Sequence, residues 1–396
     1  MTQESDDLKE WIGALMLGSP RGYSYPISQH KSFLGVDTFI GCNAGCAYCF
    51  RYRKEIIDPR RTCEDREIVD GLLQHPFFVR GVTPLSVNSN STDPFHAAVR
   101  ASTLDILDML ESSGITNPIT LITKVPLPEQ EIQRLHSSSK LNLDVNVSYS
   151  AMPEEVEPIS ANARIDFMKR LAEAPIRVAL FARPIVADWN ATAEHFRAIF
   201  HAARLANVGA IIVGGLRLSD GIRSNIRRSG LAIPLGHAKD YKKYLPAELK
   251  DLILEVYREM GMNTPLVRRA SCGRALIRPN MPDFNAHWDE PERNCWSSCP
   301  VAQQRICHDQ AARVPSAKSV FDLLNRIGKE AVGFEILPTG VLLKESLPVF
   351  MISYLRLSLR FPVNACTGDL SGDADPALDV ISAAHQQAGD DLTRTG

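Results

Sequence analysis

The chain has 396 residues, of which 44% are hydrophobic and 23% are charged, and its formal net charge is −2. These values are typical of a globular protein, and a charge this close to zero gives no reason to expect a nucleic acid or an anionic membrane as partner. No run approaches about 18 uncharged apolar residues, and the acidic first residues lack the order of a signal peptide. We therefore expect a cytoplasmic protein without membrane contact, whose nine cysteines are thiols or metal ligands and not disulfides.

From residue 33 to about residue 220, short β-type runs alternate with helical patterns, as in the expected helix over 96–113. A strand followed by a helix about every 30 residues is typical of parallel βαβ units. The six expected strands cover residues 33–40, 85–89, 119–124, 141–150, 177–185 and 210–218. Six units form either an open doubly wound sheet or a curved partial barrel, and the pattern alone does not separate the two.

Three cysteines follow the first expected strand, in the segment Cys42-Asn-Ala-Gly-Cys46-Ala-Tyr-Cys49. A 4Fe–4S cluster held by three thiolates keeps one iron open to a small molecule, and an open position is the mark of a catalytic metal. The alternative is a zinc site that lacks a fourth nearby ligand. Parallel sheets gather their ligands at the carboxyl ends of strands, where this segment lies.

Beyond residue 220 the alternation ends. We expect a helix that begins near Pro246, a loop-rich segment over 272–307, and a hairpin of residues 332–337 and 341–344. The composition after residue 366 predicts a flexible tail. The expected organisation is an N-terminal extension (1–32), a core (33–220), a C-terminal extension (221–366) and the tail (367–396).

Short motifs near the ends of the later expected strands accompany the cysteines. They are Ser91-Thr92-Asp93-Pro94, Thr123-Lys124, Val147-Ser148-Tyr149-Ser150, Glu157-Pro158 with Arg164, and Arg183-Pro184-Ile185. Over residues 33–218 the chain thereby resembles the spore photoproduct lyase-like branch of the radical S-adenosylmethionine (SAM) superfamily. The resemblance implies an α/β fold: a partial (β/α)6 TIM-like barrel of the radical SAM type, followed by a C-terminal Cys-containing extension.

The resemblance also implies cofactors and a reaction. Cys42, Cys46 and Cys49 would hold a 4Fe–4S cluster that binds SAM through its open iron, and Tyr48 fits the aromatic position of the motif. After reduction by a donor such as flavodoxin or ferredoxin, the cluster would cleave SAM to methionine and a 5′-deoxyadenosyl radical. That radical would abstract a hydrogen atom from an organic substrate, with the reaction left open between lyase, isomerase and oxidoreductase types.

Three further residues would hold the polar end of SAM by the same resemblance: Thr92, Lys124 and Ser148. A zwitterionic amino-acid group needs a cation for its carboxylate and short hydroxyl partners for the rest. The alternatives are a solvated surface lysine at Lys124 and backbone capping by Thr92 and Ser148.

One position departs from the branch. The lyase that repairs spore DNA has a cysteine there as hydrogen-atom donor, and this chain has Asn90. An amide holds its hydrogen too strongly for that step, which argues against DNA repair and leaves radical generation intact. We expect a biosynthetic small molecule or peptide as the substrate; the alternatives are a DNA-lesion lyase and a non-catalytic Fe–S or zinc binding protein.

A second group of cysteines lies in the C-terminal extension: Cys272, Cys295, Cys299 and Cys307. Four thiolates suit an auxiliary Fe–S cluster, a zinc site that also recruits His287 or His308, or unligated core cysteines. Within an iron–sulfur enzyme we favour the cluster. Cys63 and Cys366 are unassigned. Arginines at 223, 227 and 228 and at 268, 269, 274 and 278 would form either a phosphate-binding patch or a solvated face.

Overall fold

The structure is a computed structural model that describes residues 26–49, 58–138, 140–234, 245–283, 295–296, 298–309 and 313–365. Its strands are β1 (Ile27–Gln29), β2 (Leu34–Val36), β3 (Phe39–Ile40), β4 (Arg60–Arg61), β5 (Leu85–Val87), β6 (Pro118–Thr123), β7 (Asn142–Ser148), β8 (Arg177–Ile185), β9 (Ala210–Gly215), β10 (Leu266–Val267), β11 (Phe334–Leu337), β12 (Gly340–Leu343) and β13 (Val363–Ala365). Its helices are α2 (Asp65–Gln74), α3 (Arg100–Ser112), α4 (Glu129–Ser137), α5 (Ala161–Glu173), α6 (Ala187–Asn190), α7 (Ala193–Leu205), α8 (Asp220–Arg228), α9 (Ala247–Glu259), α10 (Ala270–Leu276), α13 (Val301–Asp309), α14 (Ala317–Arg326) and α15 (Val349–Leu359). None of these helices is long and apolar enough to cross a lipid bilayer.

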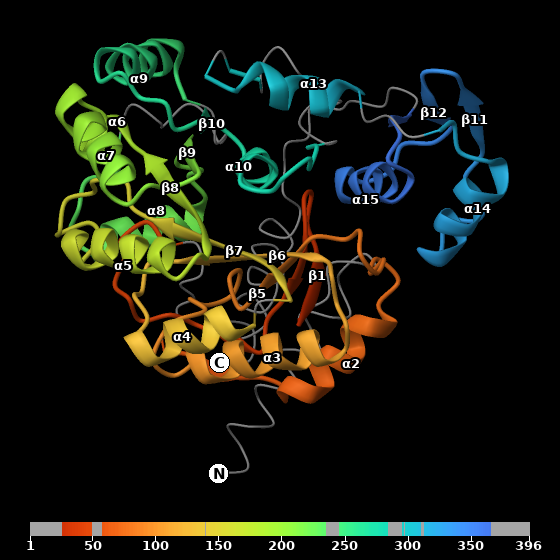
Figure 1. The fold of residues 1–396 in the computed structure, drawn as a ribbon, viewed down its shortest axis with the longest axis horizontal. Coiled ribbons are helices and arrows are strands. Elements are labelled where there is room, and N and C mark those ends of the chain that lie inside the picture. The colour runs from red at the N-terminus through yellow and green to blue at the C-terminus, as the bar shows by residue number, and fades with distance from the viewer. Residues whose placement is uncertain are drawn as a thin grey trace, which may run out of the picture.

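A mostly parallel sheet forms the centre of the fold (Figure 1). Its strand order is β1-β2-β5-β6-β7-β8-β9-β10, with β1 antiparallel to β2 and every later pair parallel. A doubly wound sheet reverses its strand order at a switch point, whereas this order follows the chain without reversal. The doubly wound alternative is therefore excluded. In the described part of the chain β1 and β10 are not paired, so the sheet is open.

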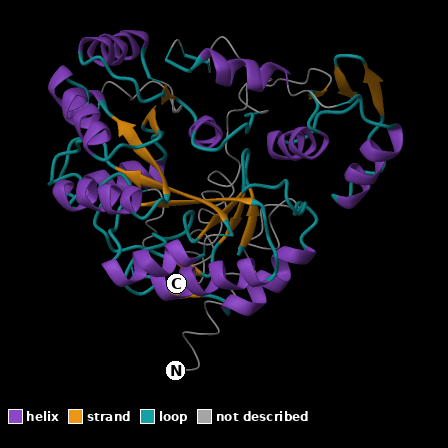
Figure 2. Cartoon of the chain, viewed as in Figure 1, coloured by secondary structure: helices purple, strands orange, loops and turns teal. Residues whose placement is uncertain are grey.

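The two faces of the sheet differ in polarity, and β7 illustrates why. Leu143, Val145 and Val147 belong to the main apolar core together with residues of the flanking helices. Because side chains alternate along a strand, Asp144, Asn146 and Ser148 point to the opposite face. Figure 2 shows helices wrapped around one side of the sheet. At β7 the other, concave side of the sheet carries a row of buried polar groups.

Most expected elements are close to those in the structure. The strand over 177–185 has the same bounds as β8, and the expected hairpin is formed by β11 and β12. The helix expected over 96–113 is α3, which begins only at Arg100. The expected strand over 33–40 is wrong as a single element, because the chain leaves the sheet at Asp37. The carboxylate of Asp37 accepts hydrogen bonds from the backbone N–H groups of Asn90 (3.1 Å) and Ser91 (3.2 Å). Beyond this point β3 pairs with β4 instead.

Helix α10 lies on the concave side of the sheet, across from α3 and α4 (Figure 1), and contacts β8, β9 and β10. Gly273 permits this approach, because a Cβ atom there would clash with the side chain of Ile212. Arg274, in the last turn of α10, donates from Nε to Thr120 Oγ1 (3.0 Å) and from Nη1 to the carbonyl of Ser32 (3.0 Å).

Arg278 follows α10 and is also buried. It forms an ion pair with Asp144 of β7 and donates to the carbonyl of Ile119 at 3.0 Å. Arg274 and Arg278 are 3% and 4% exposed. The sequence suggested that these two arginines form either a phosphate-binding patch or a solvated face. Both interpretations are wrong for Arg274 and Arg278. They join the C-terminal extension to the strands.

The end of the described chain forms a small second layer, the three-stranded sheet β11-β12-β13 with α14 and α15. Helix α15 packs through Phe350 and Tyr354 against Phe77, which follows α2. Cys366 and the expected tail lie outside the described residues.

Candidate active site

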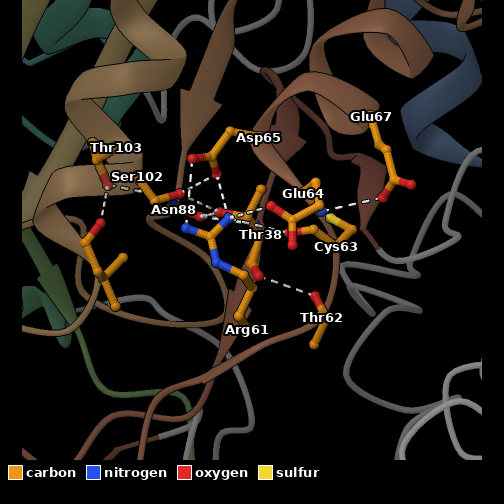
Figure 3. A network of polar contacts seen from close by, with 11 residues as sticks. Thr38, Arg61, Thr62, Cys63, Glu64, Asp65, Glu67, Asn88, Ser102 and Thr103 are labelled. Atoms are coloured by element: carbon orange, nitrogen blue, oxygen red, sulfur yellow. Dashed lines mark hydrogen bonds and ion pairs between the residues drawn. The ribbon is translucent and has the colours of Figure 1, made fainter. Parts of the chain in front are cut away.

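Residues 41–49, here called the cysteine loop, carry Cys42, Cys46 and Cys49. Just before this loop, a buried polar network holds the chain in place (Figure 3). Thr38 donates from its backbone N–H to Asn88 Oδ1 (2.8 Å), and its hydroxyl lies 3.0 Å from that of Ser102. The Ser102 hydroxyl in turn donates to Asp65, which also binds Arg61 Nη1 at 2.9 Å. The network ties the entry of the loop to α2, α3 and β5. Cys63 lies at its edge, and burial raises the pKa of the Cys63 thiol to about 11.

Glycine and backbone contacts shape the loop itself. Gly41 and Gly45 have φ values of 90° and 78°, which only glycine adopts without strain. The backbone N–H of Ala47 donates to the carbonyl of Val156 (2.9 Å), and Asn225 Nδ2 donates to the carbonyl of Cys49 (2.8 Å). The loop is thus held to segments that follow β7 and β9.

The apolar side chains of the loop pack over the same strand ends. Ala47 and Tyr48 belong to an apolar cluster whose other members follow β7, β8 and β9: Met152, Val156, Val186, Leu216, Leu218, Ile222 and Ile226. Cys46 packs against this cluster, and burial raises the pKa of its thiol to about 12 while Lys124 opposes the rise. Cys42, Cys46 and Cys49 therefore lie at the carboxyl ends of the parallel strands.

The centre of the site is Glu157, which is 1% exposed. Its carboxylate accepts a hydrogen bond from the hydroxyl of Tyr48, pairs with Lys124 Nζ at 2.9 Å, and pairs with the guanidinium of Arg164. Burial by itself would raise the pKa of Glu157, but Lys124 and Arg164 lower it to about 2. Two cations against one carboxylate leave one positive charge on this group.

Lys124 contacts two other residues that were predicted from the sequence to bind the cofactor, Ser148 and Tyr48. Its Nζ donates to Ser148 Oγ at 2.7 Å and lies 5.4 Å from the centre of the Tyr48 ring. Its side chain is only 18% exposed, which excludes the alternative of a solvated surface lysine. Ser148 is the last residue of β7; its hydroxyl donates to the carbonyl of Arg183 (3.5 Å), and its own carbonyl accepts from Arg164 Nη1 at 2.9 Å.

Thr92 lies next to Asp93, whose side chain contacts the residues of the site. The Asp93 carboxylate accepts from the Thr123 hydroxyl (2.6 Å) and from the backbone N–H of Lys124 (2.8 Å). The Thr92 hydroxyl is buried and has no hydrogen-bond partner among the described residues. It does not serve as a backbone cap, and a buried hydroxyl left unpaired costs free energy that a ligand would recover.

The concave side below this group carries further unpaired polar atoms. Both amide atoms of Asn146 and the hydroxyls of Ser86 and Ser150 are buried without a partner among the described residues. Asn146 lies two residues before Ser148 on the same face of β7. Asn146 was not among the residues predicted from the sequence, although its place in the polar alternation of 142, 144, 146 and 148 could have indicated it.

Asn90, at the position of the hydrogen-donating cysteine of the resembled lyase, is anchored in the structure. Its Nδ2 donates to Asp37 Oδ2 at 3.1 Å. The amide is thus part of the framework that separates β2 from β3.

The four C-terminal cysteines come together around one cavity of about 20 Å³, which Asp283 and Gln303 also line. Of the two histidines considered for a zinc site, His308 is exposed and bonds Asp309, and His287 lies outside the described residues. In the described ranges, no three or more His, Cys, Asp or Glu side chains, from either cysteine group or elsewhere, are arranged to hold a single metal ion.

No protein-family model and no curated protein matches this chain. Solved structures with partial similarity include a double mutant of spore photoproduct lyase with bound AdoMet and dinucleoside spore photoproduct (12% identity, 64% of this chain, 82% of that chain, TM-score 0.47). A second such structure is native anSMEcpe with bound AdoMet. The match has 12% identity, spans 57% of this chain and 58% of that chain, and has a TM-score of 0.38. The radical S-adenosylmethionine methyltransferase TsrM from Kitasatospora setae, with cobalamin and a [4Fe-4S] cluster bound, is 16% identical (46% of this chain, 34% of that chain, TM-score 0.32).

The branch that the sequence motifs resemble thus reappears among the structural neighbours. All of these TM-scores lie below 0.5, so the likeness does not by itself assign a function, and fold does not imply function in any case. The residues of the site carry the functional argument.

Proposed function

We propose that this chain is a radical SAM enzyme whose curved, open sheet is the partial (β/α)6 barrel of that superfamily. The observation that carries the proposal is the contact of the cysteine loop, through Tyr48, with Lys124 and Ser148 at the carboxyl ends of the strands. Three separate segments of the sequence, each chosen by its motif, converge on one polar group beside three thiols.

The residues present fit the two cofactors that the proposal requires. Cys42, Cys46 and Cys49 would ligate a 4Fe–4S cluster, and Lys124 and the unpaired Thr92 hydroxyl would meet the amino-acid end of SAM. When bound, the pair would supply a one-electron reductive cleavage that generates a 5′-deoxyadenosyl radical. The protein contributes binding, orientation and the exclusion of water.

Glu157 and Arg164 are positioning residues in this proposal. The Glu157 carboxylate holds Tyr48 and Lys124 on one side, and Arg164 holds Glu157 and the Ser148 carbonyl on the other. The single positive charge left on the group suits a ligand that brings a carboxylate. The Trp189 ring, 6.4 Å from that of Tyr48, adds an apolar wall.

The substrate of the proposal is a polar organic molecule, a biosynthetic small molecule or peptide, held on the concave side of the sheet. The unpaired amide of Asn146 and hydroxyl of Ser86 would donate to and accept from it. DNA-lesion cleavage is the less favoured candidate, because Asn90 cannot supply a hydrogen atom. An electron donor such as flavodoxin or ferredoxin completes the set of partners.

The test is direct. Anaerobically reconstituted and reduced protein should convert SAM to methionine and 5′-deoxyadenosine, measured by chromatography with mass detection. A protein that carries the cluster and forms no 5′-deoxyadenosine would be a binding protein, and the proposed function would be wrong.

Replacing Lys124 by methionine should weaken SAM binding about 10- to 150-fold, since loss of a charge-assisted hydrogen bond costs about 1.5–3 kcal/mol. The cluster absorbance should persist, because Glu157 keeps its pairs with Arg164 and Tyr48. Equilibrium dialysis with labelled SAM measures the affinity. Lys169→Met, at a more exposed lysine on α5, is the control and should bind like the wild type. Equal affinity for both variants would remove Lys124 from the cofactor site.

A further inference from the structure

Four cysteines of the C-terminal extension share one pocket. Cys272 lies on α10, Cys295 and Cys299 lie in the segment that leads to α13, and Cys307 lies on α13. All four line the cavity of about 20 Å³, with Val267, Ala275 and Leu276 as its apolar wall. None of the eight cysteines in the described ranges is in a disulfide. Chance burial would scatter cysteines through the core, whereas these converge from positions up to 35 residues apart (307 − 272).

The sulfur of Cys307 is surrounded as a metal ligand would be. It accepts hydrogen bonds from the backbone N–H of Asp283 and from Gln303 Nε2, each at 3.4 Å. A sulfur is a weak acceptor, and two N–H donors are aimed at this one. N–H groups on thiolate ligands also tune the potential of Fe–S clusters.

The pocket is built on rigid supports. Gln303 is itself held by the carbonyl of Met281 (2.8 Å), and the Ser298 hydroxyl donates to the carbonyl of Leu266 in β10 (2.6 Å). Cys272 and Cys299 pack against an apolar cluster on the concave face of β8 and β9. Cys272, Cys299 and Cys307 are therefore held by helices and by contacts with the sheet.

We propose that Cys272, Cys295, Cys299 and Cys307 hold a second iron–sulfur cluster, closed by four protein thiolates. A single zinc ion, with Zn–S bonds of about 2.3 Å, would draw tetrahedral sulfurs to about 3.8 Å from one another. The four cysteines line one cavity of about 20 Å³. A cluster has its metal atoms spread over a larger volume and takes thiolates that stand further apart.

The second cluster would face the concave side of the sheet and not the side that the helices α2 to α5 cover. Phe181 packs against the cluster of residues that holds Cys272 and Cys299, and Phe181 is the register partner of Ser148 on β7. The second cluster would therefore lie on the concave side of the sheet, next to the proposed active site. The proposal of a second cluster goes beyond the proposed function and does not depend on radical chemistry.

The experiment separates the two cysteine groups. The variant C42A/C46A/C49A, purified and reconstituted without air, should keep about four irons per chain with the charge-transfer absorbance of an Fe–S cluster, and the wild type about eight. Adding C299S and C307S to that variant should remove the remaining iron. Adding C63S instead, at a half-buried cysteine outside the pocket, should leave it in place.

Zinc in place of iron in the C42A/C46A/C49A protein, or no metal at all, would overturn the proposal. Because this protein keeps the second group intact, the result stands even where C299S and C307S prevent folding. Failure of the radical SAM assignment gives a different pattern: the wild type would then hold about four irons, which C42A/C46A/C49A would leave untouched.

Discussion

Replacing Cys42, Cys46 or Cys49 by alanine should each abolish the formation of 5′-deoxyadenosine from SAM. Three thiolates are the minimum that leaves one iron of a cubane open, and losing any one undoes the ligand set. We expect the rate to fall below detection, a loss of more than about a thousandfold, or about 4 kcal/mol in activation free energy. Chromatography of single-turnover mixtures that contain reduced protein and SAM measures it.

The matched control is Cys63→Ala. Cys63 lies in the network behind the loop and is half-buried, so its replacement tests the loss of a thiol without the loss of a proposed ligand. It should retain cleavage. Cleavage at the wild-type rate by any of the three loop variants would show that the loop does not ligate the cluster.

Much of the architecture could be predicted because its signal is local. The strand over 177–185 was predicted with the observed bounds, since its central residues 178–182 form a continuous apolar run. The split between β2 and β3 could not be foreseen, because it depends on Asp37 meeting the backbone of residues 90 and 91, which are more than 50 positions away. The sheet also recruits β1 and β10 from outside the range 33–220, and two- or three-residue strands give no periodic signal.

Several residues of the site could be predicted from the sequence, but their contacts with one another could not. Lys124 and Ser148 were singled out by motif, and the structure brings them within 2.7 Å of one another. The role of Glu157 was missed, although Glu157-Pro158 was among the quoted motifs, because a buried carboxylate is recognised only by its partners. Arg274 and Arg278 were misread for the same reason: a cluster of arginines looks alike in sequence whether it faces water or Asp144.

Replacing Glu157 by glutamine should lower the free energy of unfolding by about 3–5 kcal/mol at pH 7. The change removes the carboxylate that pairs with both Lys124 and Arg164, and a buried ion pair that loses a partner leaves an uncompensated charge. A pKa lowered from 4.5 to about 2 corresponds to roughly 3 kcal/mol, which agrees. Urea denaturation followed by circular dichroism measures the difference.

The sign of the pH dependence follows from the same pKa. A carboxyl whose pKa is lower in the folded protein stabilises it above the unfolded value of about 4.5, and this contribution is lost as the pH falls toward 2. The gap between the wild type and Glu157→Gln should therefore be full at pH 7 and shrink below pH 4.5. Glu155→Gln, at an exposed carboxylate two residues away, should change stability by less than about 0.5 kcal/mol at either pH. If Glu157→Gln unfolds at the same urea concentration as the wild type at pH 7, the carboxylate does not hold the cations of the site together, and Lys124 and Arg164 must find their support elsewhere.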